Sequence, residues 1–367
     1  MARLGVGAAA APLVVMALNP AEAMGRGYHC GPIGAEYYRR NLDGTVTCQL
    51  CPRGERLSNG QFGFCRTRRN IGGELKTFAS GQPCVLNVDP IEKNPLANVL
   101  PGASVLSIAH AGCNMRCLYC QNWEFSQQSA METANIEFHS EEALSKGKEK
   151  RLAGVNFTYT EGTTHIEFNK RLAAEARRLG FRAFLCTNGY IQPGPLADFL
   201  QVVDAVTVTI KGMNPDFQSK CLAVADYSPV FETCKRIKAS GKWIEAATLL
   251  VPGLNDSDDE IRRIAEWIAR NLGTNTPWHL ERFSPKYKMQ DRPPTPAATL
   301  EKAHAIGRAA GLRFVMISNL APHPANNTYC PRCNKPVIKR VGFKVIQNTL
   351  RNGRCPGCGA LLPGIWS

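Results

Sequence analysis

The chain has 367 residues, 44% of them hydrophobic, so it is long enough for an enzyme domain with a large core and one or two small modules. Lys and Arg (44) exceed Asp and Glu (30), and the net charge of +14 permits an acidic partner such as nucleic acid; a basic surface that offsets metal-bound thiolates is the alternative. The 15 cysteines cluster in C-x2-C pairs and a C-x3-C-x2-C run, which excludes a small secreted disulfide scaffold and indicates metal ligation in a reducing compartment.

The chain begins with an Ala/Val/Leu-rich run ending in "AEA", the pattern of a signal-peptide core and cleavage site. Gly and Pro interrupt this run, and it is too short for a convincing membrane span. It resembles the latter part of a twin-arginine signal, and an apolar leader without a targeting role is the alternative. We exclude residues 1–24 from the fold and expect a cytoplasmic protein, with export by a truncated twin-arginine-like signal as the other option.

Three regions follow the leader. Residues 25–100 are rich in Gly, Cys and Arg, with little helical periodicity, and are expected to form a small Cys-rich N-terminal module. Residues 101–325 alternate apolar strand-like runs with amphipathic segments. Residues 326–367 form a tail with two Cys pairs.

The middle region predicts repeated strand–helix units. Residues 165–180 and 257–273 have helical character, and the second of these segments opens with acidic residues and closes on Gly. Near-continuous apolar strands joined by helices indicate a parallel sheet, closed or partly closed into a barrel, with its chemistry at the C-terminal ends of the strands. The expected strands are 104–110, 154–160, 182–188, 204–210, 243–251, 278–283 and 313–318.

The motif "AGCNMRCLYCQNW" places Cys113, Cys117 and Cys120 directly after the strand expected at 104–110. Structural zinc sites and ordinary iron–sulfur sites use four protein ligands. Three thiolates can hold three irons of a 4Fe–4S cluster and leave the fourth iron open to another ligand. The motif therefore indicates a catalytic site rather than a structural one.

This spacing, with Tyr119 before the last cysteine, resembles the signature of the radical S-adenosylmethionine (SAM) superfamily. The stretch "DPIEKNPLANVLPGASVLSIAHAGCNMRCLYCQNWEFSQ" and the segments "FTYTEGT", "CTNGYI" and "PWHLERFSPKYKMQDRPPTP" resemble the radical enzyme of the AmmeMemoRadiSam system, a family related to the activating enzymes of pyruvate formate-lyase. The resemblance implies an α/β fold: a partial (β/α)6-type radical SAM barrel with a Cys-rich N-terminal module and a C-terminal zinc ribbon.

The resemblance also implies a function. The chain is expected to bind a 4Fe–4S cluster and SAM, whose methionine part chelates the open iron, and to receive an electron from a one-electron donor such as flavodoxin or ferredoxin. Cleavage of SAM would give a 5′-deoxyadenosyl radical that abstracts hydrogen from a substrate. Kinship with the activases suggests a glycyl radical on a protein partner. Radical modification of a small molecule or RNA, and a non-catalytic metal-binding scaffold, are the alternatives.

Cofactor contacts are expected from Tyr119, Glu161, Asn188, Gly189 and Lys211. Tyr119 belongs to the signature. By resemblance Glu161 contacts the methionine part of SAM, although a carboxylate at a strand end can simply cap the next helix. Asn188, Gly189 and Lys211 end predicted strands and face the barrel mouth, where Lys211 can pair with a carboxylate or ribose oxygen of SAM.

The N-terminal module departs from the pattern of the family. Cys48, Cys51 and Cys65 are present, but Glu55 stands where a third thiol is expected. Zinc could still bind with Glu55, or with His29 or Cys30 upstream, and packed cysteines without metal are the alternative. The acidic residue that usually lies two positions before the lysine of the D-L-K-G segment is also absent, since the chain reads Thr209-Ile210-Lys211-Gly212.

The tail carries a C-x2-C…C-x2-C pattern that predicts a zinc ribbon with Cys330, Cys333, Cys355 and Cys358 as ligands. From Cys330 onward it has seven basic residues and no Asp or Glu, so contact with nucleic acid is conceivable. We favour a structural clip whose basic residues offset four thiolates. On that interpretation, neutral versions of Lys335, Lys339, Arg340 and Lys344 should leave turnover largely intact.

The remaining candidates are interpreted as core residues. Cys84, Cys186, Cys221 and Cys234 stand alone and are expected to be buried small apolar side chains. His279 lies near the start of its predicted strand, away from the barrel mouth, and is expected to be a satisfied core histidine.

Overall fold

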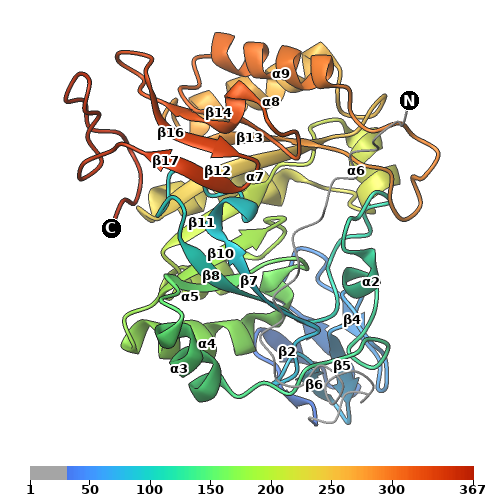
Figure 1. Ribbon diagram of the computed structural model, residues 1–367. Coiled ribbons are helices and arrows are strands. Elements are labelled where there is room, and N and C mark those ends of the chain that lie inside the picture. Colours follow the sequence, from blue (N-terminus) through green and yellow to red (C-terminus); the bar gives the residue numbers. More distant parts are fainter. Residues whose placement is uncertain (1–30) are drawn as a thin grey trace, which may run out of the picture.

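The computed structural model describes residues 31–367, and its centre is an open sheet flanked by helices (Figure 1). Neighbours in this sheet follow chain order from β14 to β7; β8 to β14 are parallel, whereas β7 is antiparallel to β8. The strands are β7 (Val85–Pro90), β8 (Ser104–Ala109), β9 (Gly154–Phe157), β10 (Arg182–Thr187), β11 (Ala205–Thr209), β12 (Trp243–Leu250), β13 (Trp278–Arg282) and β14 (Val315–Ser318). Since β7 belongs to it, the main sheet begins before the expected boundary at residue 100.

The expected α/β class is confirmed, and each expected strand segment contains one of the strands β8 to β14, with ends that differ by three residues or fewer. Strand β9 is buried at every position, and β11 at every position but its last. Both sides of these strands are covered, which explains why the sequence shows apolar runs rather than alternation.

Helices return the chain from one parallel strand to the next, and α4 (Ile166–Arg178) and α8 (Asp258–Asn271) confirm the two helix predictions. At the start of α8, the Ser257 side chain accepts a hydrogen bond from the backbone N–H of Glu260, and the first turn is acidic, which favours the positive end of the helix dipole. The other helical segments are η1 (Ile91–Lys93), α2 (Trp123–Ser126), α3 (Ser140–Glu149), η2 (Gly162–His165), α5 (Pro193–Leu200), α6 (Pro215–Leu222), α7 (Ser228–Ala239), α9 (Ala297–Ala309) and η3 (Pro324–Asn326).

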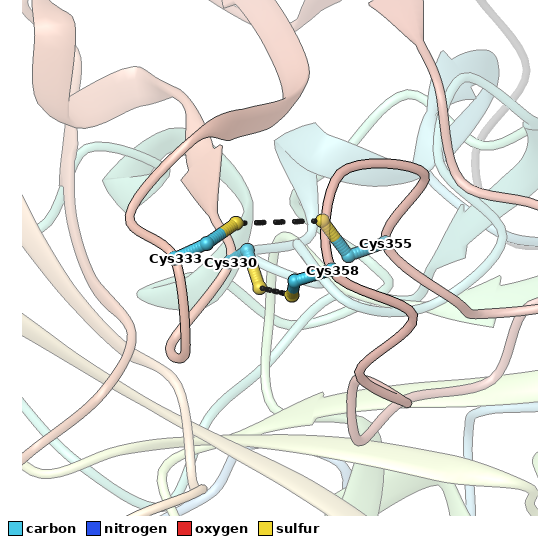
Figure 2. A group of neighbouring side chains, drawn as sticks. All are labelled: Cys330, Cys333, Cys355 and Cys358. Carbon is cyan, nitrogen blue, oxygen red and sulfur yellow. Dashed lines mark hydrogen bonds between the residues drawn. The ribbon is translucent and has the colours of Figure 1, made fainter.

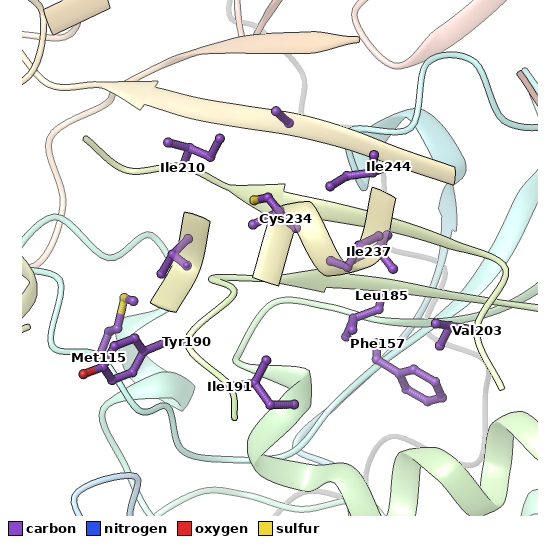
Figure 3. Close-up of a cluster of buried hydrophobic side chains, with 14 of the residues drawn as sticks. Met115, Phe157, Leu185, Tyr190, Ile191, Val203, Ile210, Cys234, Ile237 and Ile244 are labelled. Carbon is purple, nitrogen blue, oxygen red and sulfur yellow. The ribbon is translucent and has the colours of Figure 1, made fainter. Parts of the chain in front are cut away.

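The main core lies between the sheet and its helices. Phe157 and Leu185 of the strands belong to the same cluster as Ile237 of α7 (Figure 3). Met115, from the cysteine loop, and Tyr190, after β10, extend this cluster to the ends of the strands. The cysteine loop is thus anchored in the core rather than lying free on the surface.

Two small antiparallel sheets precede the main sheet, and one follows it. The first has the order β1-β6-β5 (Ile33–Gly34, Glu74–Thr77 and Arg68–Ile71), and the second has the order β2-β3-β4 (Tyr38–Arg40, Val46–Cys48 and Arg56–Leu57). The C-terminal sheet has the order β15-β16-β17 (Thr328–Tyr329, Pro336–Val341 and Lys344–Asn348) and lies beside β13 and β14 in Figure 1. The leader predicted at residues 1–24 lies outside the described residues.

Candidate functional site

A cavity of about 620 Å³ lies at the C-terminal ends of the main strands. Cys113, Cys117 and Cys120 line it, and so do four of the five residues expected to contact the cofactor: Tyr119, Glu161, Asn188 and Lys211. These residues follow or end different strands, so the parallel sheet brings them together from positions far apart in the chain.

The N-terminal module holds the cysteine loop. Gly112 has a φ of +105°, and a Cβ on it would lie 2.4 Å from the carbonyl oxygen of Cys65. This close approach lets the backbone N–H of Cys113 donate to that carbonyl at 3.2 Å. Arg116 donates to the carbonyl of Phe64, and Arg53 Nε donates to the carbonyl of Asn114 at 2.8 Å. Contacts from distant residues therefore fix a loop that has little regular structure.

Two of the three thiols, Cys113 and Cys120, have neighbouring hydrogen-bond donors suited to thiolate sulfur. The N–H of Met115 and the amide of Asn188 donate to Cys113 Sγ at 3.4 and 3.7 Å, and Cys120 Sγ lies 3.1 Å from the hydroxyl of Ser126. Burial raises the pKa of Cys113 and of Cys117, so a bound metal is needed to keep these sulfurs deprotonated at neutral pH. The donor set fits an iron–sulfur cluster with three protein thiolates.

Glu161 caps η2 and also lines the cavity, and its contact with SAM remains a prediction. Its Oε1 caps η2 by accepting from the N–H of Thr163 at 3.1 Å, and it also accepts from the Thr187 hydroxyl at 2.6 Å. Its Oε2 accepts from the N–H of Asn188 at 2.7 Å, and the residue lines the cavity. Burial raises the pKa of this carboxyl, against the opposing effect of these hydrogen bonds.

Asn188 and Gly189 differ in position. The Asn188 amide donates to Asn114 Oδ1 at 2.8 Å, which ties the end of β10 to the cysteine loop. Gly189 does not line the cavity; it has a φ of +74°, and a Cβ there would lie 3.0 Å from Val208. Its structural contribution is a tight turn behind the cavity wall, and its contact with the cofactor remains a prediction.

Lys211 and Tyr119 lie close together in the lining of the cavity. Lys211 Nζ lies 5.9 Å from the centre of the Tyr119 ring, which stacks on Phe217. The Tyr119 side chain is buried. Burial disfavours the charge on Lys211, but Cys117 and Tyr119 raise its pKa well above the ordinary value. Thr209 also lines the cavity, at the position where the family usually has an acidic residue.

Cys186 and Glu281 are among the cavity residues that were missed from the sequence. Cys186 lines the cavity from β10, which corrects the expectation of an ordinary buried thiol, and Glu281 lines it from β13. Burial raises the pKa of Cys186 to about 12, with Glu281 adding to the effect. The available signal was the two-residue strand period, because Cys186 lies two positions before Asn188 and shares its face.

The other isolated residues match their expected places. Cys84, Cys221 and Cys234 are buried. His279 is also buried, and its Nε2 lies 2.6 Å from Glu245 Oε2. Glu245 in turn accepts from the backbone N–H groups of Ala97 and Asn98 at 2.9 Å, so this pair anchors the segment between β7 and β8.

Cys48, Cys51 and Cys65 are buried in the N-terminal module. Both carboxylate oxygens of Glu55 accept from the N–H of Phe64, at 2.9 and 3.0 Å. Among residues 31–367, the ligand atoms of these four side chains do not form a group within 4.8 Å of one another. Metal at this module remains a prediction, and the upstream alternatives at residues 29 and 30 lie outside the described residues.

The thiols of Cys330, Cys333, Cys355 and Cys358 converge from two loops, with all four sulfurs within 4.8 Å of one another (Figure 2). The loops are built alike. In each, the N–H of the fourth residue after the first cysteine donates to that cysteine's carbonyl at 2.9 Å, and this fourth residue (Asn334 or Gly359) has a positive φ. Four sulfurs in this arrangement can bind one metal ion.

Arg340, counted above among the basic residues of the tail, is a buried structural residue. It lies 5% exposed on β16, and its guanidinium donates to the carbonyl of Ala97 at 2.7 Å and to Glu92 at 3.5 Å. Arg340 is therefore not an exposed charge of the kind expected, and a neutral residue there would leave buried Glu92 without its charged partner. The effect of that change on turnover remains a prediction.

None of the helices within residues 31–367 is long and apolar enough to cross a membrane.

Comparisons with known proteins agree with the motif. The sequence model of the radical SAM superfamily matches residues 107–268. An uncharacterized protein of Methanocaldococcus jannaschii is 41% identical over 327 residues, which cover 89% of this chain and 97% of that protein. The pyruvate formate-lyase 1-activating enzyme of Escherichia coli is 26% identical over 166 residues, or 44% of this chain and 67% of that enzyme. A solved radical SAM methyltransferase from Sphaerobacter thermophilus aligns with a TM-score of 0.46 and 15% identity, over 79% of this chain and 77% of that one.

Proposed function

Because the chain belongs to the radical SAM superfamily, we propose that Cys113, Cys117 and Cys120 hold a 4Fe–4S cluster and that the adjoining cavity binds SAM. When bound, the cluster supplies the electron that cleaves SAM to methionine and a 5′-deoxyadenosyl radical, which takes a hydrogen atom from the substrate. A one-electron donor such as flavodoxin or ferredoxin provides that electron.

The residues of the cavity orient the cofactor. The Oε2 of Glu161 suits the ammonium group of the methionine part, and the ammonium of Lys211 suits its carboxylate or a ribose oxygen. Asn188 keeps the cysteine loop in register with β10, and its amide points at Cys113 Sγ. The tail, with four sulfurs and no other ligand type, binds zinc.

For the substrate, the first candidate is a glycine in a partner protein. The observation that carries it is the similarity to the Escherichia coli pyruvate formate-lyase 1-activating enzyme. The second candidate is a small molecule. It is favoured by the rim of the cavity, to which Phe343 of the C-terminal hairpin contributes, because a side chain there narrows the space available to a folded partner.

The test is anaerobic incubation of reconstituted, reduced protein with SAM, followed by measurement of 5′-deoxyadenosine. Wild type should form it, and Cys117→Ala should not. If wild type forms none, the chain is a metal-binding scaffold, and if both proteins form equal amounts, Cys117 does not hold the cluster; either result overturns the proposal. Deuterium transfer into 5′-deoxyadenosine then separates the substrates: label arriving from glycine-deuterated protein supports the activase, and label arriving only from a deuterated ultrafiltrate of small molecules supports the second candidate.

A further inference from the structure

The main sheet has two edges, β7 and β14, and residues near both edges reach the same cavity. Lys93 follows β7, Asn319 follows β14, and both line the cavity together with Phe343. Phe343 lies in the turn between β16 and β17, which belong to the C-terminal sheet. A part of the tail with no motif of its own therefore reaches the candidate active site.

Arg340 joins this hairpin to the segment that follows β7, because its guanidinium donates to the Ala97 carbonyl at 2.7 Å. Its bonds to the Thr328 hydroxyl at 2.9 Å and, through its backbone N–H, to Asn327 Oδ1 at 2.7 Å hold β15 and the residue before it. The connection to β14 passes through Asn326, whose carbonyl accepts from Arg340 at 3.4 Å and whose side-chain amide donates to the Ile317 carbonyl at 2.6 Å. The hairpin is thus attached near both edge strands.

The end of the chain adds a second attachment. The N–H of Leu100 donates to the carbonyl of Ile365 at 2.7 Å, and the N–H of Ile365 donates to the carbonyl of Asn98 at 2.8 Å. Val345 of β17 packs on Gly102, where an added Cβ would lie 3.4 Å from it. The hairpin is therefore held on one side of the barrel opening at several points.

The tail has only a small core of its own. Its buried apolar cluster contains Cys330, Val337, Ile338, Cys355 and Leu362, and it is completed by Phe314 of the barrel. A core of this size does not hold a fold by itself, so the metal at the four thiols contributes to the placement of the hairpin.

We propose that Phe343 is a specificity-determining residue: the metal-held hairpin places its ring in the lining of the cavity, where it limits the width of the group that can reach the radical. This inference rests on the proposed function for the identity of the reaction. It deepens that function because it assigns the control of substrate size to the tail, whereas the cysteine loop and the expected cofactor contacts lie between residues 101 and 325.

Cys186 of β10 offers a readout that does not depend on turnover, since it lines the same cavity as Phe343. The raised pKa of Cys186 slows both reagents alike, so the ratio of the bulky to the small labelling rate is the quantity compared. In the reconstituted holoprotein, without SAM, its alkylation can be followed by peptide mass spectrometry with N-ethylmaleimide and with a bulky fluorescein maleimide. Phe343→Ala should speed the bulky reagent about tenfold, which corresponds to a barrier lower by about 1.4 kcal/mol, and should change the small reagent by less than about twofold. Ile346→Ala, on the same hairpin but 57% exposed outside the cavity, is the matched control and should change neither rate.

The role of the metal is tested with Cys358→Ser. This variant should reproduce the increase seen in Phe343→Ala, and the double variant should show no further increase, because both changes act on one element. Equal rates of bulky labelling in wild type and Phe343→Ala would overturn the proposal, and additive effects would overturn the link to the metal. If wild type forms no 5′-deoxyadenosine, the proposed function is wrong. The labelling rates still decide whether Phe343 narrows the cavity.

Discussion

Replacing Gly112 with alanine tests how the cysteine loop is built. Gly112 has a positive φ, and a Cβ would lie 2.4 Å both from the Cys65 carbonyl oxygen and from Thr67 Oγ1. The Cys65 carbonyl cannot move away without losing the hydrogen bond that it receives from the N–H of Cys113. The substitution should therefore displace the first cluster ligand as well as destabilise the fold.

The magnitude has two parts. Holding alanine at this φ costs about 1–3 kcal/mol. Fitting the methyl group into occupied space costs about another 1–3 kcal/mol. The total of about 2–6 kcal/mol is a large share of the 5–15 kcal/mol that typically stabilises a domain.

Gly180→Ala is the matched control, since Gly180 has a φ of +84° but nothing within 4 Å of an added Cβ. It should lose only the backbone part, about 1–2 kcal/mol, and keep its iron. Denaturant unfolding of the metal-free proteins measures the stabilities, and iron content after reconstitution measures the loop. If Gly112→Ala loses no more stability than Gly180→Ala and binds a full complement of iron, the close-approach argument is wrong.

Three further outcomes follow from the structure. Cys113→Ala should lose the iron chromophore while Cys186→Ala keeps it, as iron analysis would reveal, although both thiols line one cavity. Arg340→Met should lower the free energy of unfolding by about 3–5 kcal/mol because its carboxylate partner stays buried, whereas Lys339→Met, exposed on the same strand, should change it little. Burial lowers the pKa of His165 from 6.5 to about 4. Between these two pH values His165 is therefore neutral in the native state and protonated in the unfolded chain. His165 should accordingly lower stability by about 1.4 kcal/mol per pH unit as pH drops through this window. Denaturation of His165→Gln across pH should show a slope shallower by that amount, while buried His110, whose pKa is also lowered, keeps its own contribution.

Sequence patterns predicted those parts of the molecule whose structure is set by residues close together in the chain. The strands β8 to β14 were predictable because burial on both faces gives each a nearly continuous apolar run. The C-x2-C pairs likewise predicted two sulfur loops, since each loop is closed by its own backbone hydrogen bonds. Strand β7 was missed because "VLNVDP" is a short mixed segment inside a Cys- and Gly-rich region, and it becomes a strand only by pairing with β8.

The rest of the site depends on contacts between residues far apart in sequence. Arg340 and Glu92 are 248 positions apart, and nothing local marks either as buried. Phe343 is an ordinary hairpin residue until the hairpin is placed against the barrel. These positions follow from tertiary packing, which sequence periodicity does not encode.

The N-terminal module shows how contacts between distant residues support the cysteine loop. Glu55 stands where the resembled family has a thiol, and its carboxylate accepts the N–H of Phe64 with both oxygens. Phe64 lies between the guanidinium groups of Arg53 and Arg116, at 3.5 and 4.1 Å from its ring centre, and Arg116 also donates to its carbonyl. The next residue after Phe64 is Cys65, whose carbonyl accepts the hydrogen bond from the N–H of Cys113. Glu55 therefore secures by hydrogen bonds the segment on which the cysteine loop rests, and that support does not require a metal in the module.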